Sequence, residues 1–131
     1  MKVLALDYGS ARTGVAVSDP SGLIARPLTV VEQVRTKPGT ERLLALIAEE
    51  QPEQIVVGLP LTLRGEHGKQ ARETEAFAKS LRDSVAVPVE LYDERLTTVL
   101  AARTASDTPE DARAAAHLLE SFLTWLNRHE N

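Results

Sequence analysis

The sequence predicts an α/β protein with a mixed five-stranded sheet, three antiparallel strands followed by two parallel ones, and helices on both faces. Three strand-like segments follow one another closely between residues 3 and 31, which suits antiparallel hairpins. Two later apolar segments alternate with amphipathic helical segments, which suits parallel crossovers. The 131 residues are 43% hydrophobic and 26% charged, so we expect one domain, residues 1–131, with its own hydrophobic core.

The first strand is a continuous apolar run, Val3 to Leu6, that ends at Asp7-Tyr8-Gly9. Such a run is typical of a strand buried on both faces, and an acid at its end is costly unless it is paired, hydrogen-bonded or bound to a metal. Asp7 could instead simply begin a turn. Val15 to Ser18 resumes the strand pattern as the hairpin partner. A third strand is predicted from Leu23 to Val31, and Pro27 places it at an edge.

The rest of the chain alternates between helices and strands. Helical spacing of apolar residues predicts a helix from Glu41 to Gln51, after a polar loop that contains Pro38-Gly39. The remaining predicted elements are a buried strand at 54–58, a loop at 61–68, a helix at 69–84, an alternating strand at 85–92, a short helix at 96–104 and a final helix at 110–128.

Composition excludes several classes of protein. The chain has no cysteine, which excludes disulfides and thiolate metal sites and suits a reducing cytoplasm. We see no targeting leader, and no apolar run approaches the ~18 residues of a membrane span, so a cytoplasmic protein is expected. The net charge of −4 argues mildly against an obligate nucleic-acid binder but leaves a local basic groove open.

Acidic residues occur where the first and last predicted strands end. Asp7 closes the first strand, Asp93 and Glu94 close the last, and the carboxyl ends of parallel strands meet at one edge of a sheet. Strand alternation lets only one of Asp93 and Glu94 meet Asp7, and the pattern does not choose between them. Asp111 could complete a cluster, although Thr108-Pro109-Glu110-Asp111 is also typical of a helix N-terminus. Three clustered acids call for a divalent cation such as Mg²⁺ or Mn²⁺.

Four motifs follow one another along the chain. They are Leu4-Ala5-Leu6-Asp7-Tyr8-Gly9 with Gly14-Val15-Ala16-Val17, then Ile55-Val56-Val57-Gly58-Leu59-Pro60-Leu61, then Asp93-Glu94-Arg95-Leu96-Thr97-Thr98, and Asp111 with Ala114-Ala115 and Leu118-Leu119-Glu120-Ser121. Together they resemble the YqgF/RuvX family of resolvase-like nucleases in the ribonuclease H-like superfamily. They span nearly the whole chain. The resemblance implies a ribonuclease H-like fold and metal-dependent hydrolysis of nucleic-acid phosphodiesters.

The resemblance also implies roles for individual residues. Asp7 matches the first-strand acid, Glu94 the strand-end acid and Asp111 the helix acid, as catalytic residues and ligands of Mg²⁺ or Mn²⁺. One metal ion would activate water and a second would stabilise the departing 3′ oxygen, although the sequence does not fix the number of ions. Members of the family have been linked to maturation of the small-subunit ribosomal RNA precursor and to resolution of branched DNA such as Holliday junctions. The sequence does not choose between these substrates.

Residues near the proposed acids are candidates for substrate contact. These are Gly9, Arg12, Lys69 and Arg95, with Arg64 and Arg72 as further candidates. Each of the arginine and lysine candidates could equally be a solvated surface charge. Arg95 could also pair with Asp93 or Glu94. Residues 101–107 hold one arginine where the family often has a longer basic loop, which weakens the case for a large four-way junction.

Two further functions and one assembly stay open at this point. The acidic charge and the short segment 101–107 favour a non-catalytic RNA- or ribosome-associated binding factor, for which Asp7→Asn would leave function intact. Asp7-Tyr8-Gly9 with Gly14 also resembles the first phosphate loop of sugar kinases and actin-like ATPases, but the sequence shows no pattern for the second lobe that those phosphotransferases need. A homodimer would suit a twofold substrate.

Overall fold

The computed structural model describes residues 1–62, 64–96 and 110–129. Within these residues the chain forms strands and helices in the predicted order. The elements are β1 (Val3–Asp7), β2 (Arg12–Ser18), β3 (Ala25–Glu32), α1 (Lys37–Glu50), β4 (Gln54–Leu59), α2 (Lys69–Ser84), β5 (Val89–Asp93), the short 3₁₀ helix η1 (Glu94–Leu96) and α3 (Glu110–His129).

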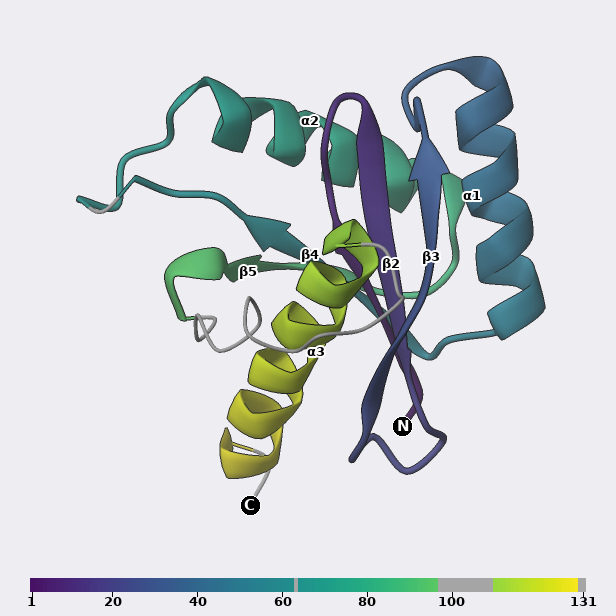
Figure 1. Ribbon diagram of the computed structural model, residues 1–131, viewed down its shortest axis with the longest axis vertical. Coiled ribbons are helices and arrows are strands. Elements are labelled where there is room, and N and C mark those ends of the chain that lie inside the picture. Colours follow the sequence, from purple (N-terminus) through teal and green to yellow (C-terminus); the bar gives the residue numbers. More distant parts are fainter. Residues whose placement is uncertain (63, 97–109, 130–131) are drawn as a thin grey trace.

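The five strands form one mixed sheet in the order β3-β2-β1-β4-β5. The β1–β2 and β2–β3 pairs are antiparallel, and the β1–β4 and β4–β5 pairs are parallel, as the sequence predicted. Helices α1 and α2 cover one face of the sheet and α3 lies across the other (Figure 1). The carboxyl ends of β1, β4 and β5 therefore share one edge, where sites of α/β proteins form.

The sheet separates two hydrophobic cores, and its central strand β1 contributes side chains to both. Leu4 and Leu6 pack under α1 and α2, whereas Val3 and Ala5 pack under α3. Successive side chains of a strand point to opposite faces, so the same alternation places Asp7 on the α3 face of the sheet. The apolar stripe of α3, which includes Phe122, packs against this face of the sheet.

Two predicted boundaries are wrong for identifiable reasons. Helix α1 begins at Lys37 rather than at Glu41, because Thr36 caps it through a hydrogen bond from the Gly39 amide. Pro38 lies in the first turn, where its missing N–H removes no helical hydrogen bond. Strand β5 begins at Val89 rather than at residue 85, immediately after Pro88, which cannot donate to a sheet.

The second strand also begins earlier than predicted, at Arg12 rather than at Val15, so the loop before it is shorter. The remaining predicted elements lie close to those observed. Helix α2 has the predicted bounds, and β3 is an edge strand as Pro27 indicated. Most of the predicted helix at 96–104 lies outside the described residues. In the part of the chain that the structure describes, none of the helices has both the length and the apolar character needed to cross a membrane.

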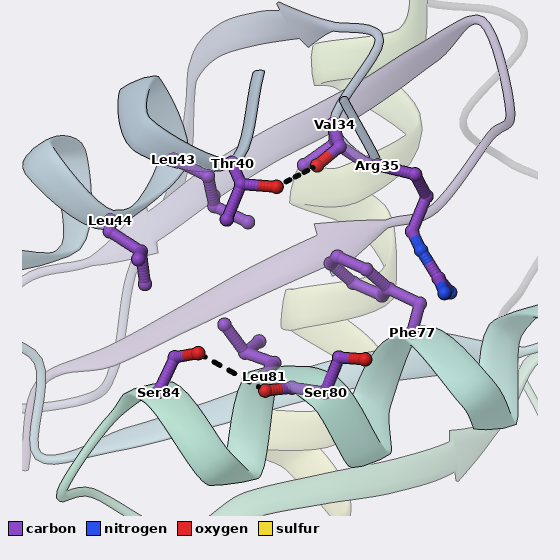
Figure 2. Close-up of a pocket in the computed structure, with 9 residues that line it drawn as sticks. All are labelled: Val34, Arg35, Thr40, Leu43, Leu44, Phe77, Ser80, Leu81 and Ser84. Carbon is purple, nitrogen blue, oxygen red and sulfur yellow. Dashed lines mark hydrogen bonds between the residues drawn. The ribbon is translucent and has the colours of Figure 1, made fainter. Parts of the chain in front are cut away.

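A pocket of about 200 Å³ opens between α1 and α2, on the face of the sheet opposite α3 (Figure 2). Phe77, Leu43 and Leu81 form its apolar floor. Its polar lining includes Thr40, whose hydroxyl donates to the Val34 carbonyl, and Ser84, whose hydroxyl donates to the Ser80 carbonyl. No acidic residue lines this pocket, so it is separate from the acids at the edge of the sheet.

Candidate active site

Asp7 and Glu94 meet on the α3 face of the sheet, although they come from opposite sides of β4. Asp7 ends β1, and Glu94 follows the last residue of β5. Their carboxyl groups are hydrogen-bonded to each other. Two carboxylates this close cannot both be ionised without repulsion, so one of them retains a proton.

The pKa values of both carboxyl groups are raised. Burial raises the pKa of Glu94 to about 7, with further contributions from the charge of Asp7 and the hydrogen bond to it. Burial also raises the pKa of Asp7, but the hydrogen bond from Glu94 opposes that rise. Near neutral pH, the protonated form of Glu94 donates to the Asp7 carboxylate.

The structure also separates the roles of Asp93 and Glu94. Tyr92 packs into the core under α3, so alternation places Asp93 toward the other face. Glu94 begins η1, and its side chain lies against Gly58 of β4. Asp93 instead accepts hydrogen bonds from the Arg95 guanidinium. Nε lies 3.1 Å from Oδ1 and 3.0 Å from Oδ2, and Nη2 lies 2.6 Å from Oδ2. This ion pair lowers the pKa of Asp93. Asp93 therefore forms one of the two ion pairs with Arg95 that the sequence allowed. Glu94 is the acid that faces Asp7.

Asp111 lies in the first turn of α3, close to the end of β1. Gly14 of β2 is paired in register with Asp7, and a Cβ on Gly14 would overlap the backbone carbonyl of Asp111. Because Gly14 has no side chain, α3 can begin in direct contact with the sheet at this point of β2. The charge of Asp111 raises the pKa of Asp7, and its carboxylate pairs with Arg12 at 3.4 Å from Nε.

The Arg12–Asp111 ion pair is exposed. The two side chains are 64% and 40% accessible to solvent, and an ion pair this exposed contributes less than about 1 kcal/mol to stability. Arg12 can therefore leave Asp111 for a phosphate group at little cost in stability.

The three predicted acids are gathered only in part. Asp7 and Glu94 are in contact, whereas the side chain of Asp111 is paired with Arg12. Among the described residues, no group of three or more His, Cys, Asp or Glu side chains forms a ready-made metal site. The donor set still fits a hard cation, because Mg²⁺ and Mn²⁺ prefer carboxylate oxygens and keep several waters. A cation would also neutralise the repulsion that a second ionised carboxylate creates.

The predicted substrate-binding residues lie in three places. Gly9 is in the β1–β2 turn, where its carbonyl accepts from the Thr13 hydroxyl and a Cβ would overlap the Arg12 carbonyl. Lys69 is exposed at the start of α2. Arg95 is held by Asp93, and its Nη1 would lie 3.3 Å from a Cβ on Gly65, so its guanidinium also borders the segment before α2. Sequence reasoning did not anticipate the steric roles of Gly14 and Gly58, although a glycine inside a strand is a signal of close approach.

A mixed sheet of this order, with helices on both faces, has the ribonuclease H-like architecture. The RuvX family, described as Holliday junction resolvase, matches residues 1–125, and the chain belongs to this family.

Relatives from several bacteria are named as nucleases, in agreement with the family match. Proteins of Roseiflexus sp. and Rhodococcus erythropolis, each named "Putative pre-16S rRNA nuclease", are 42% and 43% identical to this chain. The first alignment covers 93% of both chains, and the second covers 89% of this chain and 69% of the relative. These relationships support a nuclease.

Solved structures show the same fold at low sequence identity. Thermus thermophilus RuvC in complex with a Holliday junction substrate superposes with a TM-score of 0.66 at 18% identity, over 98% of this chain and 97% of that one. The fowlpox virus resolvase bound to Holliday junction DNA gives a TM-score of 0.60 at 11% identity, over 96% and 99% of the two chains.

Proposed function

We propose that this protein is a divalent-cation-dependent nuclease that cleaves the precursor of 16S ribosomal RNA. The observation that carries the proposal is the approach of two acids at the carboxyl edge of the sheet. Asp7 ends β1, the Glu94 side chain reaches from η1 across Gly58 of β4, and each carboxyl group shifts the pKa of the other. The names of the relatives support RNA as the substrate. A precursor of this kind is made in the cytoplasm, where a chain without cysteine is also expected to work.

Asp7 and Glu94 would hold the cation, and Asp111 would supply a third carboxylate after it releases Arg12. A bound divalent cation supplies an activated water and stabilises the departing 3′ oxygen in this class of reaction. The chain contributes two partly buried carboxyl groups, one at the end of β1 and one at the start of η1. Glu94 must lose its proton to serve as a ligand, so cation binding should strengthen as the pH rises through about 7.

Substrate binding is assigned to the basic residues around this pair. Arg12 lies beside Asp111 at one side of the acids, and its exposed guanidinium can reach a phosphate group. Gly9 would let a backbone approach the β1–β2 turn, and Lys69 offers an exposed ammonium at the start of α2. Arg95 would act mainly by holding η1 through Asp93.

Resolution of branched DNA is the second candidate function. It is favoured by the RuvX description and by the fold shared with two resolvases bound to Holliday junctions. Such a substrate has twofold symmetry, and this function would therefore call for a homodimer.

A cleavage assay tests both candidates together. Labelled precursor RNA with its 16S flanking sequences, single-stranded DNA and a four-way junction are each incubated with Mn²⁺, Mg²⁺ or a chelator. We expect metal-dependent cutting of the RNA by wild type, loss of at least 100-fold in Asp7→Asn, and unchanged cutting by Asp83→Asn, a matched control at an exposed acid of α2. Preferential cutting of the junction would favour resolution, and equal cutting by Asp7→Asn would overturn the metal-site proposal.

A further inference from the structure

We infer that Gly58 is a positioning residue of the candidate active site, because the missing side chain at this point of β4 leaves the passage through which Glu94 reaches Asp7. The catalytic consequence of this inference rests on the proposed function. The steric relationship itself does not, and it can be tested without any cation or substrate.

Strand order makes such a passage necessary. Strand β4 lies between β1, which carries Asp7, and β5, which leads into Glu94. The Glu94 side chain starts beyond the end of β5 and approaches Asp7 across β4. Val56 packs into the core under α3, so alternation places position 58 on that same face. Gly58 is paired in register with Tyr92, two residues before Glu94.

The crossing takes place directly over Gly58. A Cβ at this position would lie 2.5 Å from Oε1, 2.9 Å from Cγ and 3.1 Å from Cδ of Glu94. All three distances are shorter than an ordinary carbon contact of about 3.5–4.0 Å. The three nearest atoms all belong to the Glu94 side chain, so this side chain lies against the α-carbon of Gly58.

The strand itself does not require glycine here. Positive φ values among the glycines occur at Gly22 and Gly65 in the described residues, and Gly58 has an ordinary strand conformation. Glycine also weakens a strand relative to residues with a side chain. The remaining reason for glycine at position 58 is the space that Glu94 occupies.

Gly58 and Gly14 should therefore respond differently to alanine. At Gly14 the added methyl meets the backbone of α3, which cannot move without displacing the helix. At Gly58 it meets a flexible side chain, which can rotate away while the sheet stays intact. In Gly58→Ala, we expect a folded protein in which Glu94 no longer reaches Asp7. Displacing one of two contacting carboxylates should weaken Mn²⁺ binding by roughly 10- to 100-fold.

Crystal structures of metal-free wild type and Gly58→Ala provide the first test. We expect the β4 backbone to superpose and the Glu94 carboxylate to leave Asp7. If Glu94 still contacts Asp7 in the variant, the inference is overturned. This readout holds even if wild type binds no Mn²⁺ and cuts no nucleic acid, in which case the proposed function fails separately.

A double-mutant cycle gives the second test. Mn²⁺ affinity is measured by calorimetry for wild type, Gly58→Ala, Glu94→Ala and the double variant, with Gly68→Ala as a control because a Cβ there meets only Thr62 at 4.0 Å. If Gly58 acts through Glu94, Gly58→Ala should have no further effect once the Glu94 side chain is gone. An equal loss in both backgrounds, or failure of both Gly58→Ala proteins to fold, would show that the strand needs this glycine for itself.

Discussion

Replacing Glu94 with glutamine should stabilise the metal-free protein at alkaline pH. The pKa of Glu94 is raised to about 7 in the folded protein, above its ordinary value of 4.5. Below about pH 4.5, both folded and unfolded chains carry the proton, and its favourable binding in the folded state is fully present. As the pH rises through 7, the folded protein must also release the proton, and this stabilisation is lost. Glutamine keeps a neutral donor opposite Asp7 at every pH.

The magnitude follows from the two pKa values. The interval of about 2.5 pH units between them corresponds to an upper limit of roughly 3 kcal/mol, at 1.36 kcal/mol per unit. Glu94 is only partly buried and titrates together with Asp7, so solvent screening and coupling reduce the effect. We expect the free energy of unfolding to fall by on the order of 1–2 kcal/mol because of this group between pH 5 and pH 8.

Urea unfolding in the presence of a chelator measures this effect. Wild type and Glu94→Gln are compared at pH 5, 6, 7 and 8, and Glu49→Gln serves as a control at an exposed glutamate of α1. Wild type and the control should lose stability with rising pH relative to Glu94→Gln. Parallel pH profiles for Glu94→Gln and wild type would refute the account of the Asp7–Glu94 pair.

Three further predictions concern the cation and the start of α3. Mn²⁺ at about 100 times its dissociation constant should raise the free energy of unfolding of wild type by about 2.7 kcal/mol and leave Asp7→Asn unchanged in thermal melts; an equal rise in both would place the cation elsewhere. Gly14→Ala should destabilise the protein by roughly 2–3 kcal/mol in urea, because the methyl overlaps the Asp111 carbonyl, and a neutral effect would contradict that contact. Asp111→Asn removes only an exposed ion pair with Arg12 and should cost less than about 1 kcal/mol, yet lower cleavage at least 100-fold; retained cleavage would exclude it as a ligand.

Much of the fold could be predicted because local patterns of apolar residues indicate the helices and strands. Apolar runs mark β1 and β4, and helical spacing marks α2 and α3, so the order of elements gave the mixed sheet. The errors arose at two prolines, because proline is compatible with more than one local structure. Pro38 was interpreted as part of a loop, but it occupies the first turn of α1, and alternation before Pro88 extended β5 too far toward residue 85.

The candidate site was predictable only as a set of residue types at strand ends. The residues alone could not decide whether Glu94 or Asp93 meets Asp7, because the answer depends on which face of the sheet Tyr92 packs against. The contacts of Gly14 with α3 and of Gly58 with Glu94 join elements far apart in the sequence. Such contacts depend on strand order and register, which local patterns do not contain.

The most direct test of the central claim is the position of a bound cation. A crystal of the protein soaked in Mn²⁺ would be measured for anomalous diffraction. We predict a peak beside the carboxylates of Asp7 and Glu94, the residues that would hold the cation, and a loss of the Arg12–Asp111 ion pair. An absent peak, or one remote from Asp7 in a crystal that retains an accessible site, would contradict the assignment of these acids as the metal centre of a nuclease.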